Sequence, residues 1–112
     1  SLYNSKIFNK KIYLPKVRNN SYHSFHIYPV LVDNRKKFLD FLKKKGINLS
    51  IHYSRLTFLD PGYRGLCKYN LNKLKNAINL SKKTVSLPMY PELTNNEIQK
   101  IIKIINSYEN NK

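Results

Sequence analysis

The chain has 112 residues and a mass of 13.3 kDa, which suffices for one domain and excludes the two-domain body that most cofactor enzymes need. No stretch approaches the roughly 20 apolar residues that span a bilayer, and the N-terminus lacks the apolar segment of a signal peptide, so we expect a cytoplasmic protein without a membrane partner. Lys and Arg number 21 against 6 Asp and Glu, and the net charge of +15 is usual for proteins that bind phosphates or nucleic acid.

Two observations bear on partners and compartment. The lysines are spread along the whole chain, and their densest runs, at 35–37 and 43–45, fall where the polar face of a helix is expected. A solvated helix face therefore explains the runs without a nucleic-acid ligand. The single Cys67 has no partner for a disulfide or a cysteine metal site, which agrees with a reducing compartment.

The N-terminal half predicts a lead-in followed by a strong strand. Residues 1–20 are irregular, with a short apolar segment at 12–14. Residues 22–32 are rich in β-branched and aromatic residues and apolar on both alternating faces, which indicates a central or doubly covered strand. One face carries Tyr28 together with His26, and we expect a hydrogen-bonded core position for His26.

A helix and a second strand follow. The Asp-Asn pair at 33–34 can cap a helix whose apolar stripe ends at Gly46, in the position that commonly terminates helices. Residues 47–53 then alternate, which predicts a strand with one polar face. His52 falls on the outward polar face and Tyr53 on the inward face, where a core position with a hydrogen-bonded hydroxyl is expected.

The C-terminal half predicts a long loop, a helix, a strand and a final helix. The loop at 54–70 is long enough to suggest a functional or subunit-contacting role. An amphipathic helix is expected from 71 to 82, and a short strand at 84–87 ends before Pro88.

The last helix carries its own start signal. Thr94 with Glu97 three residues later forms a capping box, and the apolar face runs to Tyr108. Residues 109–112 are polar and are expected to fray. The order of elements predicts an α+β domain over 21–108, with a small, mainly antiparallel sheet covered on one face by helices. A fragment of a larger protein should leave an apolar face exposed.

Five motifs then follow one another along the chain: His23-Ser24-Phe25-His26-Ile27-Tyr28-Pro29-Val30, Lys45-Gly46-Ile47, Ile51-His52-Tyr53, Ser86-Leu87-Pro88-Met89-Tyr90-Pro91 and Leu93-Thr94. In this order and at these spacings the sequence resembles the C-terminal domain of the DegT-type sugar-nucleotide aminotransferases, which are fold type I pyridoxal-phosphate enzymes. The resemblance runs from about Tyr3 to Tyr108 and covers nearly the whole chain.

The resemblance implies a parent protein of roughly three times this length. In that family a large domain holds pyridoxal phosphate on a Schiff-base lysine, and the enzyme is a homodimer that aminates a nucleotide-linked keto sugar for polysaccharide or glycan synthesis. The small domain closes over the cleft. No lysine of this chain lies in the family's lysine motif, so the resemblance implies no catalytic residue here, no cofactor bound by this chain alone, and no transamination without the large domain.

Three departures from the family pattern concern polar residues. The family usually has Pro-Leu-His where this chain has Arg55-Leu56-Thr57, so a second histidine is lost. Of the family's Pro-x-Ala-Glu, only the alanine remains, as Ala77, and Leu31 replaces a common arginine. The departures imply altered substrate binding with an intact fold.

The candidate residues for the substrate mouth are His52, Tyr53, Arg55, His26 and Tyr28. His52 is the first choice because it is polar, adjoins the long loop and occupies the motif position, although a surface histidine at a strand end explains it equally. No metal site is expected, since the histidines lack metal-ligand spacing and no carboxylate pair accompanies them.

A function of another class remains open. A basic face bearing Lys36, Lys43 and Lys44, with Tyr28 or Tyr63 for stacking, would hold RNA. Such binding would weaken steeply with salt.

Overall fold

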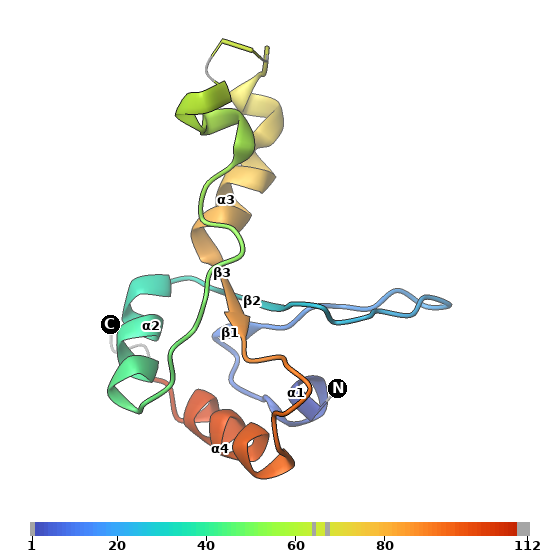
Figure 1. Cartoon of the computed structure of the whole chain (residues 1–112), viewed down its shortest axis with the longest axis vertical. Coiled ribbons are helices and arrows are strands. Elements are labelled where there is room, and N and C mark those ends of the chain that lie inside the picture. Colours follow the sequence, from blue (N-terminus) through green and yellow to red (C-terminus); the bar gives the residue numbers. More distant parts are fainter. Residues whose placement is uncertain (1, 64, 67, 110–112) are drawn as a thin grey trace.

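The computed structural model describes residues 2–63, 65–66 and 68–109, so Cys67 and residues 110–112 of the expected tail lie outside it (Figure 1). The elements in chain order are α1 (Leu2–Lys6), β1 (Ile12–Tyr13), β2 (Tyr28–Val32), α2 (Arg35–Lys44), the 3₁₀ turns η1 (Thr57–Leu59), η2 (Pro61–Tyr63) and η3 (Leu71–Leu74), α3 (Lys75–Lys83), β3 (Thr84–Leu87) and α4 (Asn95–Asn106). The radius of gyration is 15.9 Å, against about 13 Å for a compact chain of this length. The value is large because two segments project from the body, the connection between β1 and β2 and residues 54–83.

The three strands form one antiparallel sheet in the order β1-β2-β3. The central position of β2 confirms what its two apolar faces predict. Tyr28 and Val30 stand opposite Leu87 and Val85, and this face of the sheet is fully covered. The α+β class with an antiparallel sheet is therefore confirmed.

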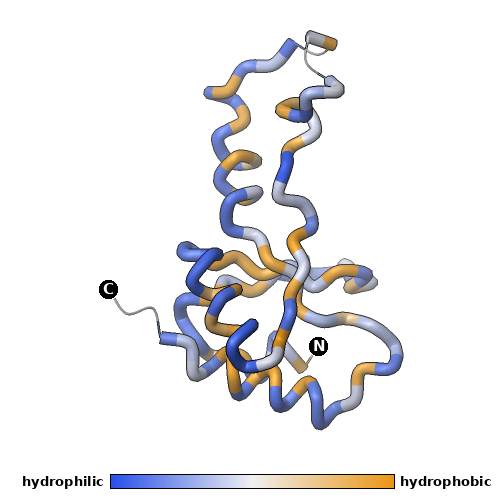
Figure 2. Tube along the Cα trace, turned by 60° about the vertical axis from the view of Figure 1, so that its left-hand side comes forward, coloured by the Kyte–Doolittle hydropathy of each residue, from blue (hydrophilic) through white to orange (hydrophobic). Residues whose placement is uncertain are grey.

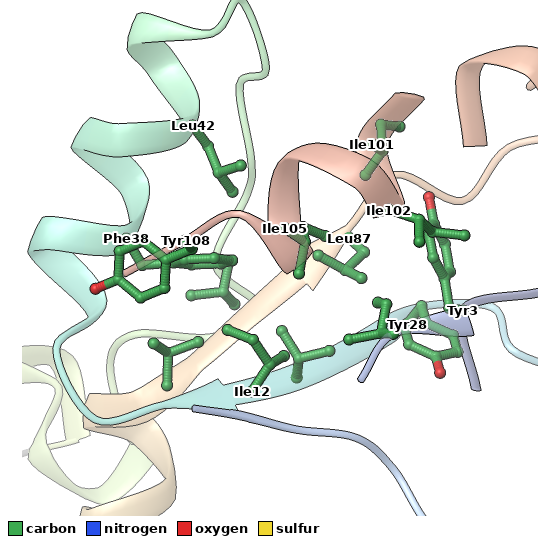
Figure 3. Packing of buried hydrophobic residues seen from close by; sticks show 14 residues of the cluster. Tyr3, Ile12, Tyr28, Phe38, Leu42, Leu87, Ile101, Ile102, Ile105 and Tyr108 are labelled. Atoms are coloured by element: carbon green, nitrogen blue, oxygen red, sulfur yellow. The ribbon is translucent and has the colours of Figure 1, made fainter. Parts of the chain in front are cut away.

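Helices α1, α2 and α4 lie on the same side of the sheet, and the core fills the space between them and the strands (Figure 3). Phe38 of α2 and Ile105 of α4 have no exposed surface. The segment expected as a lead-in contributes to this core, and the Tyr3 hydroxyl donates to the Pro88 carbonyl at 3.0 Å. The buried apolar residues are Tyr3, Ile7, Ile12, Tyr28, Val30, Val32, Phe38, Leu42, Val85, Leu87, Ile101, Ile102, Ile105 and Tyr108.

The predicted helix signals are confirmed at α2 and α4. The Asn34 side chain accepts the backbone N–H of Lys37, and the chain leaves α2 through Gly46, whose φ of +78° lies in the left-handed region. At α4 the Thr94 hydroxyl accepts from the Glu97 backbone, while the Glu97 carboxylate accepts from Thr94 in return.

The predicted strand over 22–32 is wrong in its first half. Strand β2 begins only at Tyr28, because its partner β3 ends before Pro88, which has no N–H to donate to a ladder. Phe25 has a φ of +49°, outside the extended region. His26 therefore lies beyond the end of the sheet and is exposed, so the expected core position for His26 is also wrong.

The predicted strand over 47–53 is wrong as well. This segment joins the sheet through a single bridge, in which the Ser86 N–H donates to the Ser50 carbonyl at 2.9 Å. The chain then turns at His52 and Tyr53, so the alternation stops there. Tyr53 is 72% exposed and is not a core residue.

Residues 54–83 form an arm that projects away from the sheet (Figure 1). The predicted helix is present as η3 followed by α3, and α3 buries none of its side chains. The base of the arm is fixed to the body, since the Arg35 guanidinium donates to the Ser81 carbonyl and Lys83 pairs with Asp33 at 2.7 Å. Hydrophobic residues lie along both limbs of the arm (Figure 2).

The second face of the sheet carries an apolar groove of about 470 Å³ between the strands and the arm. We call it the apolar groove, and it is lined by Pro29, Leu31, Leu56, Ala77 and Leu80 among others. An apolar face left uncovered on a domain of this size is what the sequence predicts for a chain that packs against a further partner.

The Tyr108 hydroxyl generates a prediction, because it is buried and has no hydrogen-bond partner among the described residues. Burial also raises the pKa of Tyr108. Since an unpaired buried hydroxyl costs free energy, Tyr108→Phe should raise the free energy of unfolding in urea by about 1 kcal/mol. Tyr3→Phe is the control, because it removes a hydroxyl that is bonded to Pro88, and it should lower stability. Equal losses in both variants would contradict the prediction.

Candidate functional site

A hollow of about 450 Å³ opens at the edge of the sheet beyond β3. Its walls are the segment 45–50, the residues 86–90 that leave β3, and the first turns of α4. We call it the edge hollow. The hollow exists because β3 stops pairing with β2 at the pair Tyr28 and Leu87. The segment before Tyr28 and the segment after Leu87 then diverge.

His52 is held in the wall of the edge hollow by Ser86. Its Nδ1 lies 2.8 Å from the Ser86 hydroxyl, and Ser86 is only 5% exposed. This bond orients the ring and leaves the Nε2 edge for other contacts. His52 also lines the apolar groove, so its ring lies between the two concavities.

The edge hollow is bordered by basic side chains. Lys45, Lys100 and His26 line it, together with one carboxylate, that of Glu97. That carboxylate is committed to the cap of α4: it accepts from the Thr94 hydroxyl at 2.7 Å and from the Thr94 N–H at 2.9 Å. These bonds hold the pKa of Glu97 below its usual value.

The other candidate residues lie elsewhere. Tyr53 lines the apolar groove with an exposed ring. Arg55 lies on the arm and pairs with Asp60 at 3.2 Å; the Gly62 N–H and this arginine lower the pKa of Asp60. Tyr28 has no exposed surface, so it supports the fold and cannot touch a ligand directly.

The structure therefore brings His26 and His52 together at one hollow, and adds polar residues that sequence reasoning did not select. Ser86 and Tyr90 line the edge hollow and belong to the motif at 86–91, so that motif held the signal. Lys45 and Lys100 carried no such signal, because exposed lysines are common throughout this chain.

The described residues do not fit pyridoxal phosphate. A lysine that holds the cofactor has to be enclosed beside it, whereas every described lysine is exposed except the half-buried Lys83, which pairs with Asp33. Within the described ranges no group of three His, Cys, Asp or Glu residues could hold a metal ion. None of the helices described is both long and apolar enough to cross a membrane.

The sequence pattern of the DegT/DnrJ/EryC1/StrS aminotransferase family matches residues 1–106. The chain belongs to this family. The protein MJ1066 of Methanocaldococcus jannaschii is 30% identical over 111 residues, covering 93% of this chain and 28% of that protein. The dTDP-3-amino-3,6-dideoxy-alpha-D-galactopyranose transaminase of Aneurinibacillus thermoaerophilus is 26% identical, covering 95% of this chain and 28% of that enzyme.

A solved family structure has the same fold. The DegT/DnrJ/EryC1/StrS aminotransferase from Brucella abortus superposes with a TM-score of 0.86 at 23% identity, covering 98% of this chain and 29% of that one. The chain spans about 28% of the length of MJ1066 and of the Aneurinibacillus thermoaerophilus transaminase. The RNA-binding alternative gains no support, and Tyr28 is too deeply buried to stack on a base.

The bond between His52 and Ser86 yields a prediction. Ser86→Ala removes the partner of Nδ1, so the His52 ring should change from one dominant tautomer to a mixture, measured by nitrogen-15 NMR of the imidazole. Stability should fall by about 1 kcal/mol. Ser50→Ala is the matched control, because Ser50 lines the same hollow and contacts β3 through its backbone only. An unchanged tautomer in Ser86→Ala would refute the bond.

Proposed function

We propose that this chain is the small domain of a pyridoxal-phosphate-dependent sugar aminotransferase and that it completes the substrate cleft of a large domain it does not contain. The observation that carries the proposal is the family match over residues 1–106 in a chain that spans about 28% of its relatives. The cofactor and its lysine would belong to the large domain, in keeping with the exposure of the lysines described. The isolated chain would therefore neither bind the cofactor nor transfer an amino group.

The apolar groove is the surface we assign to the large domain. Its lining is dominated by side chains such as Pro29, Leu31 and Leu56, and burying them would remove apolar surface from water. The arm carries further exposed apolar residues, among them Leu66 and Leu71, which we assign to the partner subunit of a homodimer. Both surfaces are too apolar to remain in water in an assembled enzyme.

The substrate mouth would combine His52, His26, Tyr53 and Arg55, all of which have accessible side chains. We propose a nucleotide-linked keto sugar as substrate, in polysaccharide or glycan synthesis. The transaminase of Aneurinibacillus thermoaerophilus is by its name an enzyme of a dTDP-linked amino sugar, which supports a nucleotide-linked sugar here. A cytoplasmic location is part of the proposal, as expected for a chain with one cysteine.

A chimera tests the proposal. The matched region of the Aneurinibacillus thermoaerophilus transaminase is replaced by residues 1–106 of this chain, and cofactor binding and amino transfer to that enzyme's sugar are measured. We expect both activities, with slower transfer than in the intact relative because Thr57 replaces the family's second histidine. His52→Ala in the chimera should lower kcat/KM about tenfold, the loss expected for one hydrogen bond to substrate.

Two controls accompany the chimera. His23→Ala removes an exposed histidine that does not line the edge hollow and should leave kcat/KM within about twofold. Ile105→Asp breaks the core and should abolish both activities. A chimera that folds and binds the cofactor yet transfers no amino group, or amino transfer by the isolated chain, would overturn the proposed function.

A further inference from the structure

A further groove, of about 860 Å³, lies between α4 and the segment that leaves α1. We call it the Phe8 groove, and its main lining residues are Lys6, Phe8, Lys100, Ile102, Lys103 and Asn106. Helices α1 and α4 lie on the covered face of the sheet, whereas the apolar groove lies on the second face (Figure 1). A protein part seated in the apolar groove would therefore not fill the Phe8 groove.

Phe8 is held at the Phe8 groove by hydrogen bonds on both sides of its backbone. The Phe8 N–H donates to Asn106 Oδ1 at 3.1 Å, and Asn106 Nδ2 donates to the Lys6 carbonyl at 3.0 Å. The next residue, Asn9, donates to two carbonyls at the end of α4. The Phe8 side chain is nevertheless 78% exposed. Since the backbone around Phe8 is fixed to α4, its ring is positioned for a contact before a partner arrives.

The Phe8 groove is bordered by positive charge on both sides. Lys6 comes from α1, and Lys100 and Lys103 come from α4. The described lining contains no acidic residue, and none of the ion pairs among the described residues involves these three lysines. The side chain of Ile102 lies between them and is almost fully buried, so the floor of the groove is apolar. Ammonium groups around an apolar floor complement a surface that carries both carboxylates and apolar side chains.

We propose that the Phe8 groove docks an acidic, amphipathic segment of another protein, with an apolar side chain against Phe8 and Ile102 and carboxylates beside Lys100 and Lys103. A second copy of this chain does not fit, because the net charge of +15 would bring like charges together. A concave surface with an apolar floor takes up the side chains of a peptide segment, as grooves that bind amphipathic helices do. The inference does not rest on the proposed function, since it concerns the other face of the domain.

The test begins with a selection of short random peptides, displayed on phage, on the immobilised 112-residue chain. We expect the enriched peptides to combine Asp or Glu with Leu, Ile, Phe or Trp. An enriched peptide is then synthesised and titrated into the isotope-labelled chain, and the NMR shifts should lie at residues 6–8 and 99–107. Phe8→Ala should raise Kd about tenfold, because the ring would be buried in the complex. Lys103→Gln should raise Kd about threefold, as is usual for a charge at the rim of an interface.

Tyr22→Ala and Lys43→Gln are the matched controls. Tyr22 is a 96% exposed aromatic residue that does not line the Phe8 groove. Lys43 lies in the last turn of α2, as Lys103 does in the last turn of α4. Each control should change Kd by less than about twofold. Phe8→Ala should unfold in urea at the midpoint of the parent chain, because the ring is exposed, so that weaker binding is not a folding defect.

Four outcomes would overturn the proposal. Equal weakening by Lys43→Gln and Lys103→Gln would show diffuse attraction to a basic chain. Enrichment of purely acidic or purely apolar peptides would contradict the stated chemistry of the partner, and shifts away from the Phe8 groove would place the contact elsewhere. Tighter binding of phosphatidylserine vesicles by the parent chain than by Phe8→Ala would identify a lipid surface in place of a protein segment. The chimera assay does not involve this peptide, so its failure is distinguishable from a failure here.

Discussion

The end of β3 at Pro88 is the constraint on which the rest of the site depends. Because proline has no N–H, the ladder between β2 and β3 stops at the pair Tyr28 and Leu87. The chain beyond Pro88 is then fixed by another contact, the hydroxyl of Tyr3 on the Pro88 carbonyl. The two chains diverge at this point and leave room for the edge hollow, while α1 is tied to the same place.

The asymmetry of the sheet follows from how the helices are arranged. Helices α1, α2 and α4 cover one face, and fourteen apolar residues of the described ranges are buried there, which leaves the second face to the arm (Figure 1). The arm stands away from the sheet and makes a groove with it instead of a second core. A domain built in this way has a stable body and an apolar surface that only a further protein part can cover.

Sequence reasoning succeeded where the signal is local. The capping box of Thr94 and Glu97, the termination of α2 near Gly46 and the central position of β2 all depend on residues within a few positions of one another. Each of these features has the same physical cause in the sequence and in the structure.

Sequence reasoning failed where a distant residue decides the outcome. The alternation at 47–53 predicted a strand, but β3 offers this segment only the bridge at Ser86. The alternation at 22–32 gave no warning that pairing would end opposite Pro88, which is about sixty positions away. Periodicity indicates which side of a chain is apolar and says nothing of where a partner strand stops. The predicted core positions of His26 and Tyr53 are wrong for this reason.

His52 connects the edge hollow with the apolar groove. Of the described residues, His52 is the one that lines both the edge hollow and the apolar groove, and the bond to Ser86 holds its ring against β3. A large domain seated in the apolar groove would touch this imidazole directly. Any shift of the ring on docking would therefore change the wall of the edge hollow without a longer chain of contacts. An imidazole suits this place because its ring has two distinct nitrogens, so Nδ1 can bond Ser86 while the second nitrogen serves another contact.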